Sequence, residues 1–147
     1  MPEVVFVCYG NICRSPIGEA LLARALNERL GDGHDWIVSS AGVGATDGTP
    51  ASRGTKDVLK ARGIDFRSHR ARYLTPAMAR AAELIVCMEP QQVEQVRRIV
   101  DDPDKVVLLG EGVPDPIGAG PELYEQTAAL IESHIAGLVD HLTKDPA

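Results

Sequence analysis

Long hydrophobic runs are absent from this sequence. The longest uncharged apolar stretches, such as residues 4–8 and 84–88, are far shorter than the ~20 residues that a helix needs to cross a bilayer. The first residues also lack the basic and apolar regions of a secretory signal. We therefore expect no membrane span and a cytoplasmic location.

An excess of basic residues is absent as well. The chain has 15 lysines and arginines against 21 aspartates and glutamates, which gives a formal net charge of -6. A surface that binds nucleic acid carries the opposite sign of charge, so we expect no nucleic-acid partner.

Cysteine is scarce, and the spacing of the cysteines is not that of a disulfide or metal-binding motif. The three cysteines, Cys8, Cys13 and Cys87, are an odd number without any C-x-x-C spacing. This pattern predicts neither a disulfide framework nor a zinc site, and the histidines show no ligand spacing for another metal. We expect three cytosolic thiols and no metal centre.

The composition that remains is that of one globular domain. Of the 147 residues, 44% are hydrophobic and 24% are charged, which is close to the average for soluble domains. A chain of this length has no room for a second independent core. We expect a single domain that spans residues 1–147.

Segments typical of strands and helices alternate along the chain. Continuous β-branched apolar runs predict buried strands, and apolar residues at helical spacing predict the helices between them. Such alternation predicts right-handed crossovers and hence a three-layer, doubly wound α/β sandwich with a four-stranded parallel sheet. The expected strands are residues 3–7, 36–39, 84–88 and 106–109, and the expected helices are residues 16–30, 52–61, 76–82, 90–100 and 122–142.

The loop Cys8-Tyr-Gly-Asn-Ile-Cys-Arg-Ser15 joins the first expected strand to the first expected helix. In parallel α/β sheets, ligands bind beyond the carboxyl ends of the strands, where this loop lies. A helix amino terminus adds unpaired N–H groups and the positive end of the helix dipole, which suit an anion such as phosphate. The glycines and the Lys-Ser/Thr pair of a nucleotide-phosphate loop are missing, so a different phosphate chemistry is indicated.

Each residue type in this loop suits that chemistry. Cys8, close to helix-terminal amides and to Arg14, is expected to be a thiolate that attacks phosphorus. Arg14 can hold two phosphoryl oxygens at once, which lysine does less well. Gly10 and Asn11 tolerate the left-handed backbone that turns amides inward, and Ser15 can cap the helix and bond the sulfur of Cys8. The alternative is a buried apolar cysteine beside an unrelated helix cap.

A covalent phosphocysteine mechanism also needs a proton for the leaving oxygen and later a base for water. Asp115 is the candidate for both, in a loop after the fourth expected strand that Pro114 and Pro116 stiffen. Taken alone, this Asp-Pro pair is more typical of an ordinary turn.

These residues resemble those of the low-molecular-weight protein tyrosine phosphatases. Residues 7–16 look like the phosphate loop of that family, and residues 39–42 look like its second-strand motif. Ser68-His69 is similar to its buried serine–histidine support, and Asp115-Pro116 is similar to its acid loop. The order and spacing of these motifs agree over essentially the whole chain.

The resemblance implies a role for each residue and a phosphorylated protein as the substrate, without a cofactor. Cys8 would be the nucleophile, Arg14 would hold the transition state, and Asp115 would be the general acid and base. The residues that bind phosphate would be Tyr9, Gly10, Asn11, Ile12, Cys13, Arg14 and Ser15. The residues that hold the loop in shape would be Asn11, Ser15, Ser40 and His69.

Departures from the family pattern concern the substrate. Members that act on phosphotyrosine often carry aromatics after Asp-Pro and after the second strand, where this chain has Ile117-Gly118 and residues 43–47. The segment after Asp115 looks more like the branch that removes phosphate from arginine, but that branch usually has threonine in place of Ile12. Because Ile12 offers apolar contact to a ring and Tyr9 is a candidate wall, we rank phosphotyrosine first and phosphoarginine second.

Two functions of other classes stay open. An arsenate reductase of this fold needs resolving cysteines after the third strand, where the chain has only Cys87, inside an expected strand. A phosphate-binding module without turnover would not need Asp115. Cys13, five residues after Cys8, additionally suggests that a reversible disulfide protects Cys8 against oxidation.

Overall fold

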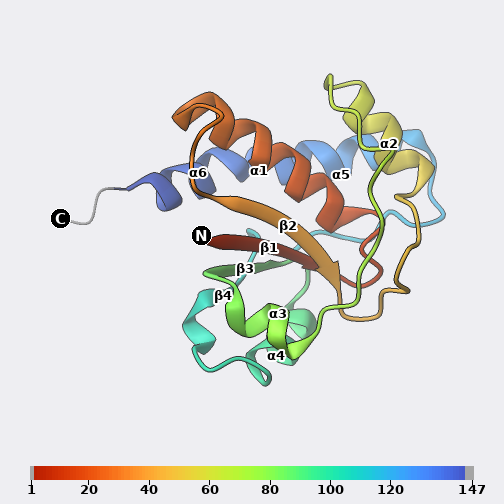
Figure 1. The fold of residues 1–147 in the computed structure, drawn as a ribbon. Coiled ribbons are helices and arrows are strands. Elements are labelled where there is room, and N and C mark those ends of the chain that lie inside the picture. The colour runs from red at the N-terminus through yellow and green to blue at the C-terminus, as the bar shows by residue number, and fades with distance from the viewer. Residues whose placement is uncertain (1, 145–147) are drawn as a thin grey trace.

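The computed structural model describes residues 2–144 and contains one parallel sheet of four strands (Figure 1). The strand order β2-β1-β3-β4 puts the first strand in the centre, and every neighbouring pair is parallel. The predicted α/β class and four-stranded parallel sheet are therefore confirmed. The strands are β1 Glu3–Cys8, β2 Ile37–Gly42, β3 Leu84–Cys87 and β4 Val106–Leu108.

Strand β1 is buried on both faces because its apolar residues form a continuous run. Val4 and Phe6 pack into one hydrophobic cluster, whereas Val5 and Val7 pack into a second cluster on the opposite face. Side chains of a strand alternate between its two faces, so a run without polar residues requires cover on both. The sheet is consequently the middle layer of three.

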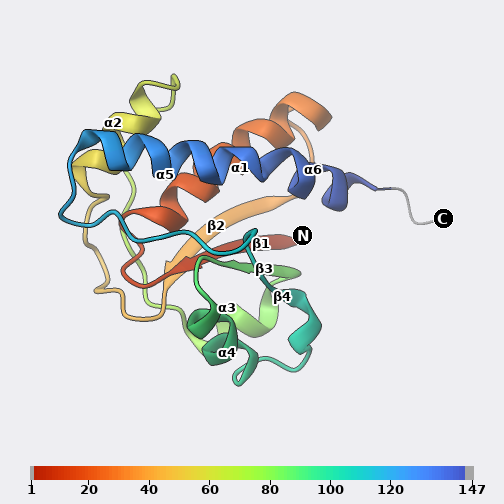
Figure 2. The same ribbon diagram turned by 180° about the vertical axis from the view of Figure 1, so that it is seen from behind.

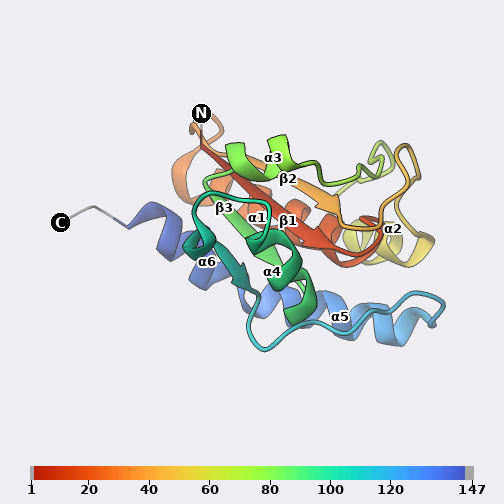
Figure 3. The same ribbon diagram turned by 90° about the horizontal axis from the view of Figure 1, so that it is seen from below.

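The helices provide this cover (Figures 1 and 2). Helices α1, α5 and α6 lie on one face of the sheet, and the short helices α3 and α4 lie on the other. Helix α2 lies near the carboxyl ends of β1 and β2 (Figure 3). The helices are α1 Arg14–Leu30, α2 Arg53–Lys60, α3 Pro76–Ala81, α4 Pro90–Arg97, α5 Pro121–Ser133 and α6 Ile135–Thr143, with a 3-10 turn at Pro103–Lys105.

The predicted final helix, residues 122–142, is wrong in one respect, because it consists of two helices. The chain breaks at His134, whose N–H donates to the carbonyl of Ile131 at 3.0 Å. The break lets the apolar residues Ile135 and Val139 of α6 turn into the core that α1 also lines. Sequence periodicity does not reveal it, since apolar residues recur on both sides.

Other expected boundaries move by a few residues. Strand β2 extends to Gly42 instead of ending at Ser39, because residues 40–42 continue to pair with β1 up to Cys8. Helix α4 ends at Arg97 rather than at Val100. Within residues 2–144, no helix combines the length and the apolar character that a membrane crossing requires.

Candidate active site

The loop after β1 turns sharply at Asn11. Its φ angle is +57°, the only positive φ of a non-glycine residue in the described part of the chain. Asparagine tolerates this left-handed conformation better than most residues, which confirms its predicted use. Gly10 was predicted to share that conformation, and this is wrong, because its φ is not positive.

The glycine that the loop needs lies on the neighbouring strand. A Cβ atom on Gly42 would lie 2.4 Å from the carbonyl oxygen of Tyr9 and 2.9 Å from the nitrogen of Asn11. The end of β2 thus approaches the loop backbone as closely as only glycine permits.

The sulfur of Cys8 is surrounded by polar groups at the carboxyl end of β1. The Ser15 hydroxyl lies 3.0 Å from it, and the N–H of Asn11 donates to it at 3.3 Å. Within residues 2–144, the N–H groups of Gly10, Ile12 and Cys13 donate to no protein acceptor. Unpaired amides beside a helix amino terminus form a cradle for an anion.

Ser15 does not cap the first helix. Helix α1 begins at Arg14, and its N-cap residue is Cys13, without a side-chain hydrogen bond to the helix. Ser15 lies inside the first turn, where its hydroxyl contacts Cys8 and accepts a hydrogen bond from Nδ2 of Asn11 at 2.8 Å. The predicted contact with sulfur is thus present, and the predicted cap is not.

Arg14 is buried, with 1% of its surface exposed. Its Nη1 donates to the carboxylate of Glu89 and, at 2.9 Å, to the carbonyl of Val113. Its Nη2 lies 3.5 Å from Oδ2 of Asp115, whereas its Nε has no hydrogen-bond partner among the described residues. One edge of the guanidinium is therefore fixed by the protein, and the Nε donor is left for another acceptor.

Glu89 is a site residue that the sequence analysis missed. It follows β3 and is the N-cap of α4, where it forms a reciprocal capping box with Gln92. The Gln92 side chain accepts from the N–H of Glu89 at 3.0 Å, and Gln91 donates to the Glu89 carboxylate. A polar residue at the carboxyl end of a buried parallel strand is a usable signal, because site residues gather at that edge.

Asp115 lies on the loop between β4 and α5. Its Oδ1 accepts from the N–H of Ile117 at 3.1 Å, while its Oδ2 faces Arg14. The Asp-Pro pair is thus both an ordinary turn and part of the site. Three side chains distant in sequence, Cys8, Arg14 and Asp115, are brought to one edge of the sheet.

A network behind the loop fixes Asn11. Its Oδ1 accepts from the N–H of Arg72 at 3.0 Å, and its main-chain oxygen lies 2.8 Å from Nε2 of His69. The His69 ring stacks on Phe66 with ring centroids 5.2 Å apart. His69 therefore contacts the loop as the resemblance implied.

Ser40 takes part less directly than expected. Its hydroxyl donates to Glu19 at 2.6 Å rather than to Asn11. Burial raises the pKa of the Glu19 carboxyl, and this is opposed by the Ser40 hydrogen bond and by the charges of His69 and Arg72. Since Arg72 Nε also donates to the Ser40 carbonyl at 2.9 Å, Ser40 is connected to Asn11 through Arg72.

Cys13 is buried beside a polar pair that the sequence analysis missed. Its sulfur lies 3.3 Å from the Tyr124 hydroxyl and 3.4 Å from the Ser52 hydroxyl. Burial raises the pKa of the Cys13 thiol, and the charges of Asp115 and Cys8 raise it further. The hydrogen bonds with Ser52 and Tyr124 oppose this rise.

Cys8 ends β1 and Cys13 directly precedes α1, so the two thiols lie at the ends of one short loop, and this placement predicts a protective disulfide. We expect mild peroxide to oxidise Cys8 to a sulfenic acid, after which the Cys13 thiol attacks, a Cys8–Cys13 bond forms and water leaves. Activity should then return on treatment with a dithiol, whereas in a Cys13→Ser variant inactivation should become irreversible. Mass mapping of the oxidised protein checks this, and intact thiols at both positions in the inactive wild type would contradict it.

The side chains around the loop differ in exposure. Tyr9 is 62% exposed, and its ring lies against Gly44 in the loop after β2, where a Cβ would lie 2.4 Å from a ring carbon. Ile12 is half-buried against the core, and Ile117 is 54% exposed. Tyr9 thus lies at the rim of the site, against residues 43–47, the segment in which related phosphotyrosine phosphatases often carry an aromatic residue.

The third cysteine lies on the opposite face of the sheet from Cys8 and Cys13, beside Val7. Cys87 is fully buried in β3, and burial raises the pKa of its thiol to about 12. A protonated thiol inside the sheet is inert, so Cys87 does not suit the resolving cysteine of an arsenate reductase. Among residues 2–144, no group of three or more histidine, cysteine or acidic side chains could hold a metal ion.

Comparison with known proteins agrees with this geometry. The family described as "Low molecular weight phosphotyrosine protein phosphatase" matches residues 3–147. The Escherichia coli protein-tyrosine-phosphatase Etp is 35% identical over 136 residues, which cover 88% of this chain and 87% of Etp.

Two solved structures share the fold. The tyrosine phosphatase Wzb from Escherichia coli, in complex with sulphate, has a TM-score of 0.85 at 32% identity and covers 95% of this chain and 97% of its own. The YwlE arginine phosphatase from Geobacillus stearothermophilus has a TM-score of 0.85 at 31% identity, with 97% and 93% covered. The chain that brings Cys8, Arg14 and Asp115 together therefore belongs to the low molecular weight phosphotyrosine protein phosphatase family.

Proposed function

We propose that this phosphatase hydrolyses phosphotyrosine in proteins through a cysteinyl-phosphate intermediate. The observation that carries the proposal is the convergence of Cys8, Arg14 and Asp115 on a loop with unpaired amides. A nucleophile, a fixed cation and a movable proton are the three parts that phosphoryl transfer through cysteine requires.

In the first step, the Cys8 sulfur attacks phosphorus. An S–P bond forms and the bond between phosphorus and the phenolic oxygen breaks, while Asp115 in its protonated form gives its proton to that oxygen. Nε of Arg14 and the loop amides bind the equatorial phosphoryl oxygens, on which charge is spread in the transition state. Glu89 and the Val113 carbonyl hold the guanidinium in place for this role.

In the second step, the Asp115 carboxylate takes a proton from water. The water oxygen attacks phosphorus, the S–P bond breaks, and phosphate and the Cys8 thiolate are released. The Ser15 hydroxyl and the Asn11 N–H, both in contact with the sulfur, stabilise the thiolate as it leaves. Asp115 ends the cycle protonated, ready for the next substrate.

The choice of phosphotyrosine rests on Ile12 and Tyr9. Tyr9 presents an exposed ring at the rim, where it contacts Gly44, and Ile12 is an apolar residue of the loop that is only partly buried. The names of Etp and Wzb describe protein-tyrosine phosphatases, which supports this choice.

Phosphoarginine is the second candidate substrate. The exposed Ile117 stands where an aromatic residue would flank a phenyl ring, and the similar YwlE structure is that of an arginine phosphatase. Turnover of matched phosphotyrosine and phosphoarginine peptides tests the ranking, with an aryl phosphate as the reference substrate. Faster cleavage of the phosphoarginine peptide by the wild type would reverse it and leave the chemistry of Cys8 intact.

Ile12 gives a prediction about this preference. We expect Ile12→Thr to shift the ratio of kcat/KM values toward phosphoarginine, since an apolar contact with the ring is lost and a hydroxyl is gained. One or two methyl groups in a pocket are worth about 1–3 kcal/mol, or about 10–200-fold in that ratio. Ile12→Val, which keeps the apolar contact, is the control, and an equal shift in both variants would contradict the role of the hydroxyl.

We further propose that the enzyme acts in the cytoplasm. Cys8, Cys13 and Cys87 are all free thiols in the structure, and a reducing compartment keeps them so. Cell fractionation with an antibody against the protein tests this location.

A further inference from the structure

A groove of about 720 Å³ lies between α2 and the segment that follows it. Its apolar floor includes Ile64 and Phe66, both half-buried. Its polar lining consists of the basic residues Arg53, Lys56, Lys60 and Arg67 and the acidic residues Asp57 and Asp65. We call this surface the α2 groove.

The charges of the α2 groove do not cancel. Arg67 pairs with Asp65 at 2.8 Å, and the hydrogen bonds from Arg67 lower the pKa of Asp65 to about 2, so both stay ionised. Arg53 lies 3.8 Å from Asp57. Both carboxylates thus have arginine partners, which leaves two lysines over.

Those two lysines make the groove positive. Within residues 2–144, Lys56 and Lys60 have no carboxylate within ion-pair distance. They lie four residues apart on one helix, so they face the same side. A positive groove on a chain whose net charge is -6 indicates an acidic ligand.

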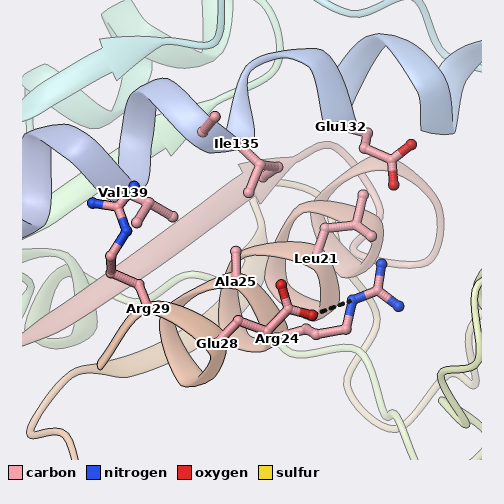
Figure 4. A pocket seen from close by; sticks show the side chains of 9 residues that line it. Leu21, Arg24, Ala25, Glu28, Arg29, Glu132, Ile135 and Val139 are labelled. Atoms are coloured by element: carbon pink, nitrogen blue, oxygen red, sulfur yellow. Dashed lines mark ion pairs between the residues drawn. The ribbon is translucent and has the colours of Figure 1, made fainter. Parts of the chain in front are cut away.

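A second groove, between α1 and the junction of α5 with α6, serves as a contrast (Figure 4). It encloses about 460 Å³, and its two arginines are each paired: Arg24 with Glu28 at 4.0 Å, as Figure 4 shows, and Arg29 with Asp140, outside the groove, at 2.9 Å. Its rim also carries Glu132. The charges of that groove therefore favour no particular ligand, whereas the unpaired lysines of the α2 groove favour an acidic one.

Two contacts join the α2 groove to the phosphate loop. The N–H of Ser52, directly before Arg53, donates to the carbonyl of Ile12 at 2.9 Å. On the other wall, Phe66 stacks on His69, whose Nε2 contacts the carbonyl of Asn11. The groove therefore begins beside the site where the phosphorylated side chain would bind.

We propose that the α2 groove binds an acidic segment of the phosphoprotein substrate, next to the phosphorylated residue. The inference rests on the proposed phosphatase function and adds a recognition element outside the reacting centre. Helix α2 has 8 residues and a length of about 12 Å, which about four residues of an extended peptide span. Glutamates and aspartates within such a stretch would pair with Lys56 and Lys60.

The test compares two double variants with equal changes in net charge. Lys56→Glu with Lys60→Glu reverses the unpaired charges of the groove. Arg98→Glu with Lys144→Glu is the control, because both residues are exposed and lie outside the groove and the phosphate loop. The substrates are an aryl phosphate, phosphopeptides with acidic residues on either side of the phosphorylated residue, and a phosphopeptide with neutral flanks.

We expect the groove variant to raise the KM of an acidic phosphopeptide about five- to twentyfold, because two charge interactions with the peptide are lost. Its kcat for that peptide and its rate of aryl phosphate hydrolysis should be unchanged. The advantage of the acidic peptide in the wild type should also fall as salt is added. The control variant should bind the acidic peptide as the wild type does. Equal KM changes in both variants, or none in either, would overturn the proposal.

A binding measurement separates this proposal from the catalytic one. An unphosphorylated acidic peptide should bind wild-type protein by fluorescence anisotropy and should bind the groove variant about five- to twentyfold more weakly, whether or not the chain hydrolyses any phosphate ester. The Lys56→Gln, Lys60→Gln double variant controls for misfolding caused by charge reversal, and it should also bind the acidic peptide weakly. Binding of a single-stranded DNA probe at the same lysines without peptide binding would overturn the proposal in favour of another partner.

Discussion

Replacement of Cys8 by serine is expected to abolish turnover and to leave the fold intact. A serine hydroxyl is far less acidic than a thiol, so groups that favour a thiolate do not produce an alkoxide, and the S–P intermediate cannot form. Serine keeps the hydrogen-bonding partners Asn11 and Ser15, and it is smaller than cysteine, so neither an unpaired polar group nor a clash arises. Steady-state hydrolysis of an aryl phosphate, with circular dichroism for the fold, measures both parts.

Cys87 offers the matched control. It lies fully buried beside Val7, with its side chain in the hydrophobic cluster on the face opposite to Cys8, so Cys87→Ala should keep full activity and lose some stability by cavity formation. If the Cys8→Ser protein retained more than a small fraction of wild-type activity, the nucleophile would have to be another group.

Replacement of Asp115 by asparagine is expected to slow hydrolysis by roughly 10²–10⁴-fold, the usual contribution of a positioned acid or base. Asparagine still accepts the hydrogen bond from the N–H of Ile117, so the turn persists and only the transferable proton is lost. The loss should be smaller for phenols of low pKa, since a good leaving group needs less help from an acid.

The dependence on the leaving group distinguishes chemistry from structure. A plot of log kcat/KM against phenol pKa should become steeper in the Asp115→Asn variant than in the wild type, because kcat/KM reports only the steps up to departure of the phenol. Glu111→Gln, an exposed carboxylate on the segment before Asp115, should leave the slope unchanged. A parallel downward displacement without a change in slope would assign Asp115 a structural role.

Much of this site is predictable because it is local in sequence. The path from Cys8 through Asn11 to Arg14 is a single turn between a strand and a helix, so residue types and spacing define its geometry. The carboxyl-end rule for parallel sheets then places Asp115 nearby, although it is about a hundred residues distant.

The unpredicted parts depend on tertiary contacts that no local pattern records. Glu89 reaches Arg14 only because α4 begins beside β1, and Tyr124 reaches Cys13 from the far helix α5. Ser40 was expected to support Asn11, but it bonds Glu19 because β2 runs along α1 at that level. The break at His134 is of the same kind, because the packing of α6 against the core ends α5 where the apolar periodicity of the sequence continues.

Gly42 shows how a constraint can originate on another strand. Its φ is not positive, so nothing in its own conformation forbids a side chain, yet the backbone of residues 9 and 11 occupies the space. Even alanine there would push the nucleophile's loop away from the sheet, and no rotamer change could relieve the collision, because main-chain atoms do not swing aside. The neighbouring loop backbone thus excludes any side chain at position 42, and a designer who reshapes the pocket through residues 43–47 has to leave Gly42 unchanged.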